Sequence, residues 1–197
     1  MSIVVHHFEQ PDRFVVGTVG EPGQRTFFLQ AKDGDRLTSV ALEKQQVSIL
    51  AERVDELLDE ALRSSGGDAA IPAVAPVGIG DKDPLEQPIV EEFRVGTITL
   101  SWDAEAGRVV IELFPVSDDD AVAASTGDDE DEVALEVEVA ADEVLVVRLE
   151  PGYARAFARR AERVVGAGRA PCRFCGGPLD PAGHVCPRAN GFRRIAE

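Results

Sequence analysis

One short pattern occurs twice in this chain of 197 residues, and it limits the possible folds more than any other feature. Residues 14–19 read Phe-Val-Val-Gly-Thr-Val, and residues 93–98 read Phe-Arg-Val-Gly-Thr-Ile. Each copy is followed by two more runs rich in β-branched residues, and then by a segment with apolar residues at helical spacing. Such self-similarity predicts a repeated structural unit. We therefore expect an α+β protein of two tandem βββα repeats that share a core, followed by a small C-terminal zinc ribbon or knuckle.

Changes in amino-acid composition along the chain indicate where the two repeats, the linker between them and the C-terminal tail begin and end. We expect the first βββα repeat over residues 1–64 and the second over residues 91–168. Prolines and a Ser-Ser-Gly-Gly run predict a linker loop at residues 65–90. A free linker has no need of apolar residues, so we expect parts of this loop to lie on the sheet through Ile71, Val74, Val77, Ile79 and Leu85. The acidic segment 117–132 repels itself and buries too little apolar surface to repay its ordering entropy, so we expect a disordered insert in the second repeat. The remaining residues, 169–197, would form the zinc tail.

The strongest chemical signal is a group of cysteines near the C-terminus. Cys172 and Cys175 are two residues apart, and this spacing allows two thiolates to hold one Zn²⁺ from a tight turn. His184 and Cys186 would complete a tetrahedral set of three cysteines and one histidine. The alternative is a redox Cys-x-x-Cys pair, which normally opens a helix in a βαβ setting that this sequence lacks. Four protein ligands leave no open position, so we expect the zinc to be structural.

Charge is divided unevenly along the chain. The whole chain carries −16, but residues 151–197 hold nine arginines against three acidic residues, which leaves +6 there and −22 in the first 150 residues. Arg155, Arg159 and Arg163 recur every four residues, so we expect them on one helix face. Guanidinium groups bind carboxylates and phosphates. The candidate anion- or partner-binding residues are Arg155, Arg159, Arg163, Arg173, Arg193 and Arg194.

Two other interpretations of this basic stripe stay open. In the first, the stripe is a solvated helix face without a partner, which is the usual role of a run of charges. Alternatively, the acidic insert at residues 117–132 lies against the stripe and masks it.

Other features narrow the class of protein. No run of about 18 apolar residues could span a bilayer, and the N-terminus lacks the cationic start and apolar stretch of a signal peptide, so we expect a cytoplasmic protein without a membrane partner. No nucleophile elbow or His-Glu-x-x-His motif identifies an enzyme. We expect a non-enzymatic interaction or regulatory adaptor with an acidic body and a basic zinc tail. The alternatives are a nucleic-acid-binding protein that uses the basic helix and tail, and an enzyme with an unidentified pocket between the repeats.

Several segments taken together resemble a known family over nearly the whole chain. They are residues 14–19, 23–30, 40–46, 93–96 and 101–103, and the cysteine-bearing tail that ends in Asn-Gly-Phe-Arg-Arg. The chain is similar to an actinobacterial family of unknown function whose members carry labels such as "repeat protein", so the resemblance implies no activity, substrate or catalytic residue. We place ParJ, a partner of the ParA-type chromosome-segregation ATPase, in the same family. The resemblance therefore implies an adaptor role, with a ParA-type ATPase as the expected partner.

Overall fold

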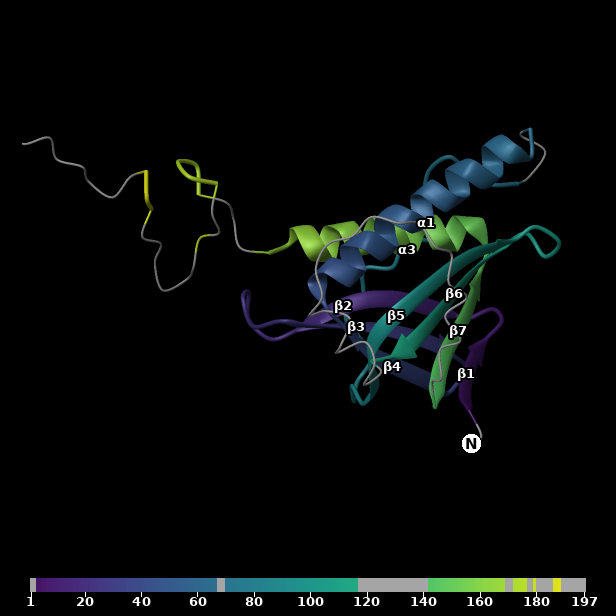
Figure 1. Ribbon diagram of the computed structural model, residues 1–197, viewed down its shortest axis with the longest axis horizontal. Coiled ribbons are helices and arrows are strands. Elements are labelled where there is room, and N and C mark those ends of the chain that lie inside the picture. Colours follow the sequence, from purple (N-terminus) through teal and green to yellow (C-terminus); the bar gives the residue numbers. More distant parts are fainter. Residues whose placement is uncertain are drawn as a thin grey trace, which may run out of the picture.

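The protein is described by a computed structural model that covers residues 3–66, 70–116, 142–168, 172–176, 179 and 186–188. The fold is a mixed α+β arrangement in which two helices lie on one side of a curved sheet (Figure 1). The elements follow in the order β1 (Val4–Phe8), β2 (Arg13–Val19), β3 (Thr26–Asp33), β4 (Arg36–Leu42), α1 (Lys44–Ser64), β5 (Glu91–Asp103), β6 (Arg108–Pro115), β7 (Glu143–Leu149) and α3 (Pro151–Gly166).

All seven strands belong to one sheet, in the order β1-β7-β6-β5-β4-β3-β2. Strands β4 and β5 pair in parallel near the middle, and β1 pairs in parallel with β7. The other neighbours are antiparallel. Four strands therefore precede α1, where the sequence predicts three, and three precede α3. Strands β2–β4 join strands β5–β7 edge to edge through β4 and β5, and the additional strand β1 pairs with β7 at the far edge. That these groups are copies of one repeated unit stays a prediction.

The helices cover one face of the sheet because each carries an apolar stripe. In α1, Val47, Leu50, Val54 and Leu58 are buried at helical spacing. A side chain of this size contributes about 1.5–3 kcal/mol when it is fully buried. Helix α1 begins with a capping box, in which the backbone N–H of Glu43 donates to the side-chain oxygen of Gln46 at 2.8 Å.

Helix α3 begins with a proline, which suits the first turn because the missing N–H has no partner there in any helix. Its buried residues are four alanines, two arginines and Phe157, whose ring centroid lies 4.6 Å from that of Phe14 on β2. The helix therefore packs against both α1 and the sheet.

The segment predicted as a linker covers part of the opposite face of the sheet. Leu85 packs there with Val15, Phe28 and Ala41, so β2, β3 and β4 are buried on both faces. Gly17 on β2 makes this contact possible, because a Cβ atom at this position would lie 2.6 Å from Cγ of Leu85. The described residues of this segment contain no helix or strand, yet it is a packed part of the domain.

The sheet is curved strongly enough to bring together strands that are not neighbours. The guanidinium carbon of Arg36 on β4 lies 4.1 Å from the ring centroid of Phe8 on β1, although β7, β6 and β5 stand between these strands. Phe8 is fully buried in the main apolar cluster as a result.

The predicted acidic insert at 117–132 lies outside the described residues, as do His184, Arg193 and Arg194. Neither described helix is long and apolar enough to cross a membrane.

Candidate metal centre and arginine sites

The three cysteines lie close together. The Sγ atoms of Cys172, Cys175 and Cys186 are all within 4.8 Å of one another, and those of Cys172 and Cys186 are 3.7 Å apart. Thiolates bound to one tetrahedral zinc ion, with Zn–S bonds of about 2.3 Å, stand about 3.8 Å apart. Cys172 and Cys186 are buried, and none of the three forms a disulfide. The donor set and its spacing therefore fit a zinc ion.

A tight turn positions the first two thiols. The backbone N–H of Gly176 donates to the carbonyl of Cys172 at 2.8 Å, and Gly176 has a φ of +75°, which favours glycine. The backbone N–H of Phe174 points at Sγ of Cys172 and, with that of Cys175, lowers the pKa of the Cys172 thiol to about 6. A lowered pKa favours the thiolate, which is the form that binds metal. His184, the predicted fourth ligand, lies outside the described residues.

Arg155 is not part of an exposed stripe, which corrects the sequence-based expectation. Its side chain is only 5% exposed, and it donates to Asp55 Oδ1 at 2.7 Å and to the carboxylate of Asp59, both on α1. It also donates to the carbonyl of Pro72 at 3.2 Å. Burial by itself lowers the pKa of Arg155, but the two carboxylates outweigh this effect and raise it above its ordinary value. Arg155 therefore joins the two helices and is not available to an external anion.

The other predicted arginines that the structure describes are exposed. Arg159 and Arg163 lie on the solvent side of α3, and Arg173 lies in the cysteine turn. Arg188 is also exposed, and its Nη1 donates to the carbonyl of Phe174 at 3.3 Å. The exposed arginines described after residue 150 therefore occur in two groups, one on α3 and one beside the cysteines.

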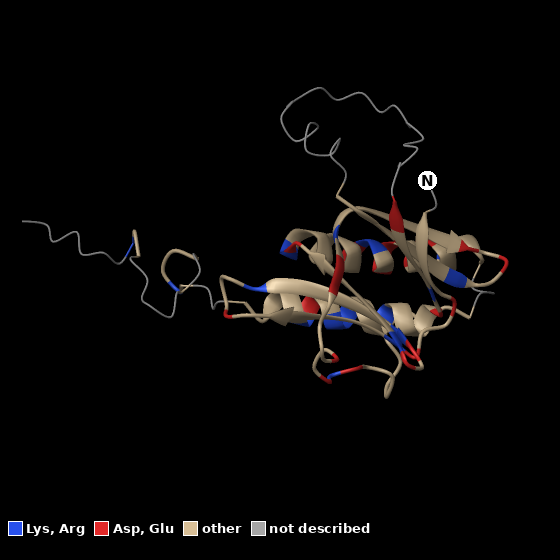
Figure 2. Ribbon diagram, turned by 90° about the horizontal axis from the view of Figure 1, so that it is seen from below, with Lys and Arg blue, Asp and Glu red and all other residues tan. Residues whose placement is uncertain are grey.

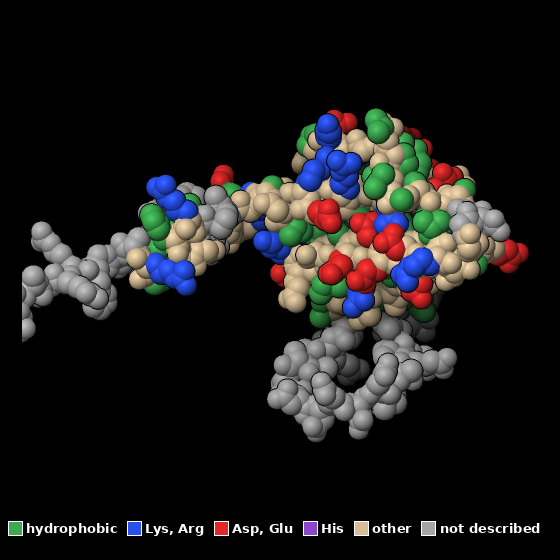
Figure 3. Space-filling model, turned by 90° about the horizontal axis from the view of Figure 1, so that it is seen from above, with side chains coloured by type: hydrophobic (Ala, Val, Ile, Leu, Met, Phe, Trp, Pro, Cys, Tyr) green, Lys and Arg blue, Asp and Glu red, His purple; other side chains and the backbone are tan. Residues whose placement is uncertain are grey.

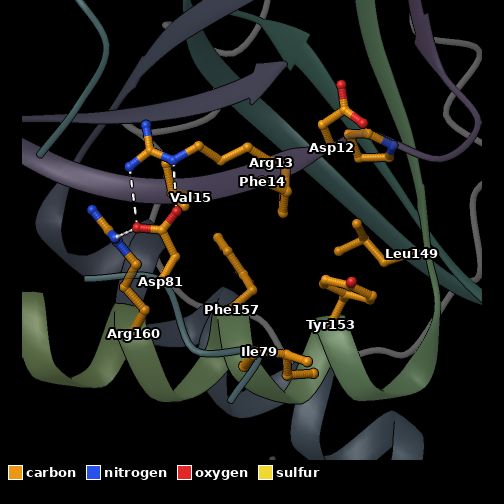
Figure 4. A pocket seen from close by; sticks show the side chains of 12 residues that line it. Asp12, Arg13, Phe14, Val15, Ile79, Asp81, Leu149, Tyr153, Phe157 and Arg160 are labelled. Atoms are coloured by element: carbon orange, nitrogen blue, oxygen red, sulfur yellow. Dashed lines mark hydrogen bonds and ion pairs between the residues drawn. The ribbon is translucent and has the colours of Figure 1, made fainter. Parts of the chain in front are cut away.

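A second arginine of α3 is also held inside the protein, by residues that the sequence analysis did not single out. Arg160 is 7% exposed and donates to the carbonyl of Val16 at 2.8 Å and to the carboxylate of Asp81 (Figure 4). Arg13 on β2 also binds Asp81, through Nε at 2.6 Å and Nη2 at 3.1 Å. The hydrogen bond from Arg13 is the largest cause that lowers the pKa of Asp81, against the opposing effect of burial. No sequence motif marked this group, because its members are far apart in the chain.

The cavity beside Asp81 is small. It has a volume of about 80 Å³ and lies between β2 and α3, where Phe14, Tyr153 and Phe157 line it (Figure 4). Sites for small-molecule ligands usually measure about 300–1,000 Å³. This cavity therefore offers no room for a substrate of ordinary size.

Comparisons with known proteins give one match. A family model described as "Protein of unknown function (DUF3090)" matches residues 6–186, a span that includes both helices and all three cysteines. No curated protein and no solved structure matches the chain.

Proposed function

This chain belongs to the DUF3090 family, whose description assigns no activity, and we propose from its own residues that it is a non-enzymatic, zinc-binding interaction protein. In this proposal a structural zinc ion shapes a basic C-terminal tail, and the exposed arginines of that tail and of α3 bind an acidic surface on a partner protein. The proposed location is the cytoplasm.

The observation that carries the proposal is the separation of α3 arginines into buried and exposed ones. Arg155 and Arg160 are neutralised by carboxylates of this chain. Arg159 and Arg163 are exposed, and in the described part of the chain neither has a carboxylate partner within ion-pair distance. Figure 2 shows Lys and Arg along both helices beside Asp and Glu. Nη2 of Arg163 donates to the backbone carbonyl of Asp81 at 3.4 Å, but this group is neutral, so we propose that carboxylates of a partner neutralise both arginines.

The cysteine turn supports the same proposal. Arg173 directly follows the buried Cys172, and Arg188 lies two residues after the buried Cys186. Both arginines are exposed, and Arg188 donates to the carbonyl of Phe174 in the turn. Figure 3 shows basic side chains on this segment, and acidic and basic side chains mixed over the helices. In the proposed Cys172–Cys175–His184–Cys186 site, zinc would keep these arginines in a fixed arrangement.

An acidic protein fits this surface better than a nucleic acid does. The first 150 residues carry −22, and a body of this charge repels the continuous phosphate charge of a nucleic acid more strongly than a local acidic patch on a protein of mixed charge. Binding to single strands usually adds aromatic stacking. Among the described residues from 166 onward, Phe174 is the single aromatic residue, and it is 54% exposed. The partner we propose is a ParA-type ATPase, which rests on the family resemblance alone.

The test is capture of partners by the full-length protein from its native cytosol, with nuclease added. The test variant combines Arg159→Glu with Arg163→Glu. The control is Arg53→Glu, which reverses an exposed charge on α1 (69% exposed) that forms a surface ion pair with Glu56. We expect a nuclease-resistant protein partner that the double variant loses and the control keeps. A purified ParA-type ATPase, titrated with the same three proteins, tests the named partner directly.

Two results would overturn this proposal. Capture that disappears with nuclease would favour the nucleic-acid alternative. Equal capture by the double variant and by Arg53→Glu would show that the exposed arginines of α3 do not bind the partner.

A further inference from the structure

A second group of potential metal ligands lies at one end of the curved sheet, on residues that the proposed function does not use. His6 on β1, Glu92 on β5 and Glu143 on β7 offer three ligand atoms that all lie within 4.8 Å of one another. Nε2 of His6 is 2.6 Å from Oε1 of Glu143. The three residues are 137 positions apart at the extremes, so only the strand order brings them together.

The alternation of side chains in the strands explains why these polar groups meet. His6 is two residues before the buried Phe8 and therefore points toward the same face. Glu143 stands in the same relation to the buried Leu145. On β1 and β7, the side chains that face the apolar core are thus preceded by His6 and Glu143. Glu92 on β5 adds a second carboxylate beside them.

A second polar group lies beside the other nitrogen of the His6 ring, Nδ1. Oγ1 of Thr38 on β4 lies 3.5 Å from Nδ1 of His6, and Thr38 is buried, with 3% of its surface exposed. This contact is at the upper limit for a hydrogen bond and joins β1 to β4, which are not neighbours in the sheet, while Nε2 on the other side of the ring faces Glu143. A polar contact to the second ring nitrogen is the arrangement that orients histidines which bind metals.

The charges at this end of the sheet favour a cation. The two carboxylates repel each other, and within the described residues Glu92 has no cationic partner. A divalent ion would neutralise both carboxylates and take the imidazole nitrogen as its third ligand.

We propose that His6, Glu92 and Glu143 form a second metal site, which binds a divalent ion such as Zn²⁺ or Mn²⁺. One imidazole nitrogen and two carboxylate oxygens suit these ions, in contrast to the soft thiolates of the cysteine centre. Three protein ligands leave at least one coordination position for water. The side chains of His6 and Glu143 are 21% and 26% exposed, so the ion exchanges with solvent more readily than an ion held by the buried cysteines.

The experiment counts bound Zn²⁺ and Mn²⁺ in the full-length protein by equilibrium dialysis and elemental analysis. Glu92→Gln is the main variant, because Glu92 is exposed and pairs with no cation in the part of the chain that the structure describes, so we expect the variant protein to fold normally. His6→Ala is the second variant, and His7→Ala on the opposite face of β1 is the matched control. All variants keep the acidic segment 117–132, so weak binding there contributes equally to every count.

We expect Glu92→Gln and His6→Ala to lose one ion per chain, or to bind it at least tenfold more weakly, while His7→Ala behaves like the wild type. Replacing Cys172 and Cys175 by serine should leave this ion in place. With Co²⁺ as the probe, the ion that remains should lack the sulfur-to-metal charge-transfer absorption of the cysteine centre. Unchanged counts for both Glu92→Gln and His6→Ala would overturn the proposal and identify the group as a polar end of the core.

Discussion

Arg155 on α3 donates to the carboxylate of Asp55 on α1 at 2.7 Å, and this bond ties the two helices together above the sheet. Helix geometry explains why the neighbouring arginines of α3 are exposed or buried. Each step of four residues turns about 40° around the helix axis, so Arg163 is about 80° away from Arg155. This rotation is enough to move a side chain from the seam between two helices into solvent. Arg160, about 140° away from Arg155, points instead toward β2, where its guanidinium contacts Val16.

Replacing Arg155 by methionine should lower the free energy of unfolding by about 1–3 kcal/mol. Methionine retains much of the apolar stem but removes every hydrogen bond to α1. This loss of stability is smaller than that usually caused by breaking a buried ion pair, because Asp55 and Asp59 are 38% and 57% exposed and water can solvate their carboxylates in the variant. Urea unfolding measures it. Arg159→Met is the control and should change stability by less than about 0.5 kcal/mol. Equal effects of both substitutions would contradict the assignment of Arg155 as the link.

Replacing Asp81 by asparagine should destabilise the protein by about 1–3 kcal/mol at pH 7, because two guanidinium groups lose their shared carboxylate. The pKa of Asp81 is lower in the folded protein than in the unfolded chain. Its contribution is therefore fully present above the unfolded pKa of about 3.9 and is lost as the pH falls through the folded value.

The difference in stability between wild type and Asp81→Asn should consequently shrink below about pH 4. Unfolding by urea at pH 7 and at pH 3 tests this. Asp83→Asn is the matched control: the contacts of that residue to Arg13 and Arg160 use its backbone carbonyl, so the substitution should have little effect. An equal difference in stability at both pH values would show that the negative charge of Asp81 does not contribute to the stability of the protein.

Gly17→Ala should cost about 1–3 kcal/mol of stability, because the new methyl group would overlap Leu85. Shortening Leu85 should relieve the overlap. In a Leu85→Ala background the same glycine substitution is therefore expected to cost much less, and a double-mutant cycle measures the coupling. Additive effects would mean that Gly17 is needed for a reason other than the contact with Leu85.

Cys186→Ser should remove about one zinc ion per chain and leave the stability of the body unchanged within about 0.5 kcal/mol. The physical reason is that the main apolar cluster contains none of the cysteines. Elemental analysis gives the metal content, and urea unfolding followed by the fluorescence of Trp102 reports on the sheet. Global destabilisation in this variant would show that the cysteine turn supports the body.

Much of the secondary structure was predictable because its signals are local. The pattern at residues 14–19 lies within β2, Arg13–Val19, and that at residues 93–98 lies within β5, Glu91–Asp103. The stripe of α1 was visible in the spacing of Val47, Leu50 and Val54. The proximity of the three cysteines was also a local prediction, since ligands for one ion need only a short loop between them.

The sequence by itself thus determined where both described helices and the strands β2–β7 form, that the 65–90 segment lies on the sheet, and that three thiols gather at the C-terminal end. Only the tertiary structure decided that β1 pairs with β7, that all strands join one curved sheet, which face of it Leu85 covers, and that Arg155 is buried. Hydrophobic periodicity acts over a few residues and records which face of an element is apolar, but not which element that face meets. Arg155 and Asp55 are 100 residues apart, as the members of the His6 group are 137 apart at the extremes, and such neighbours are set by the packing of whole elements.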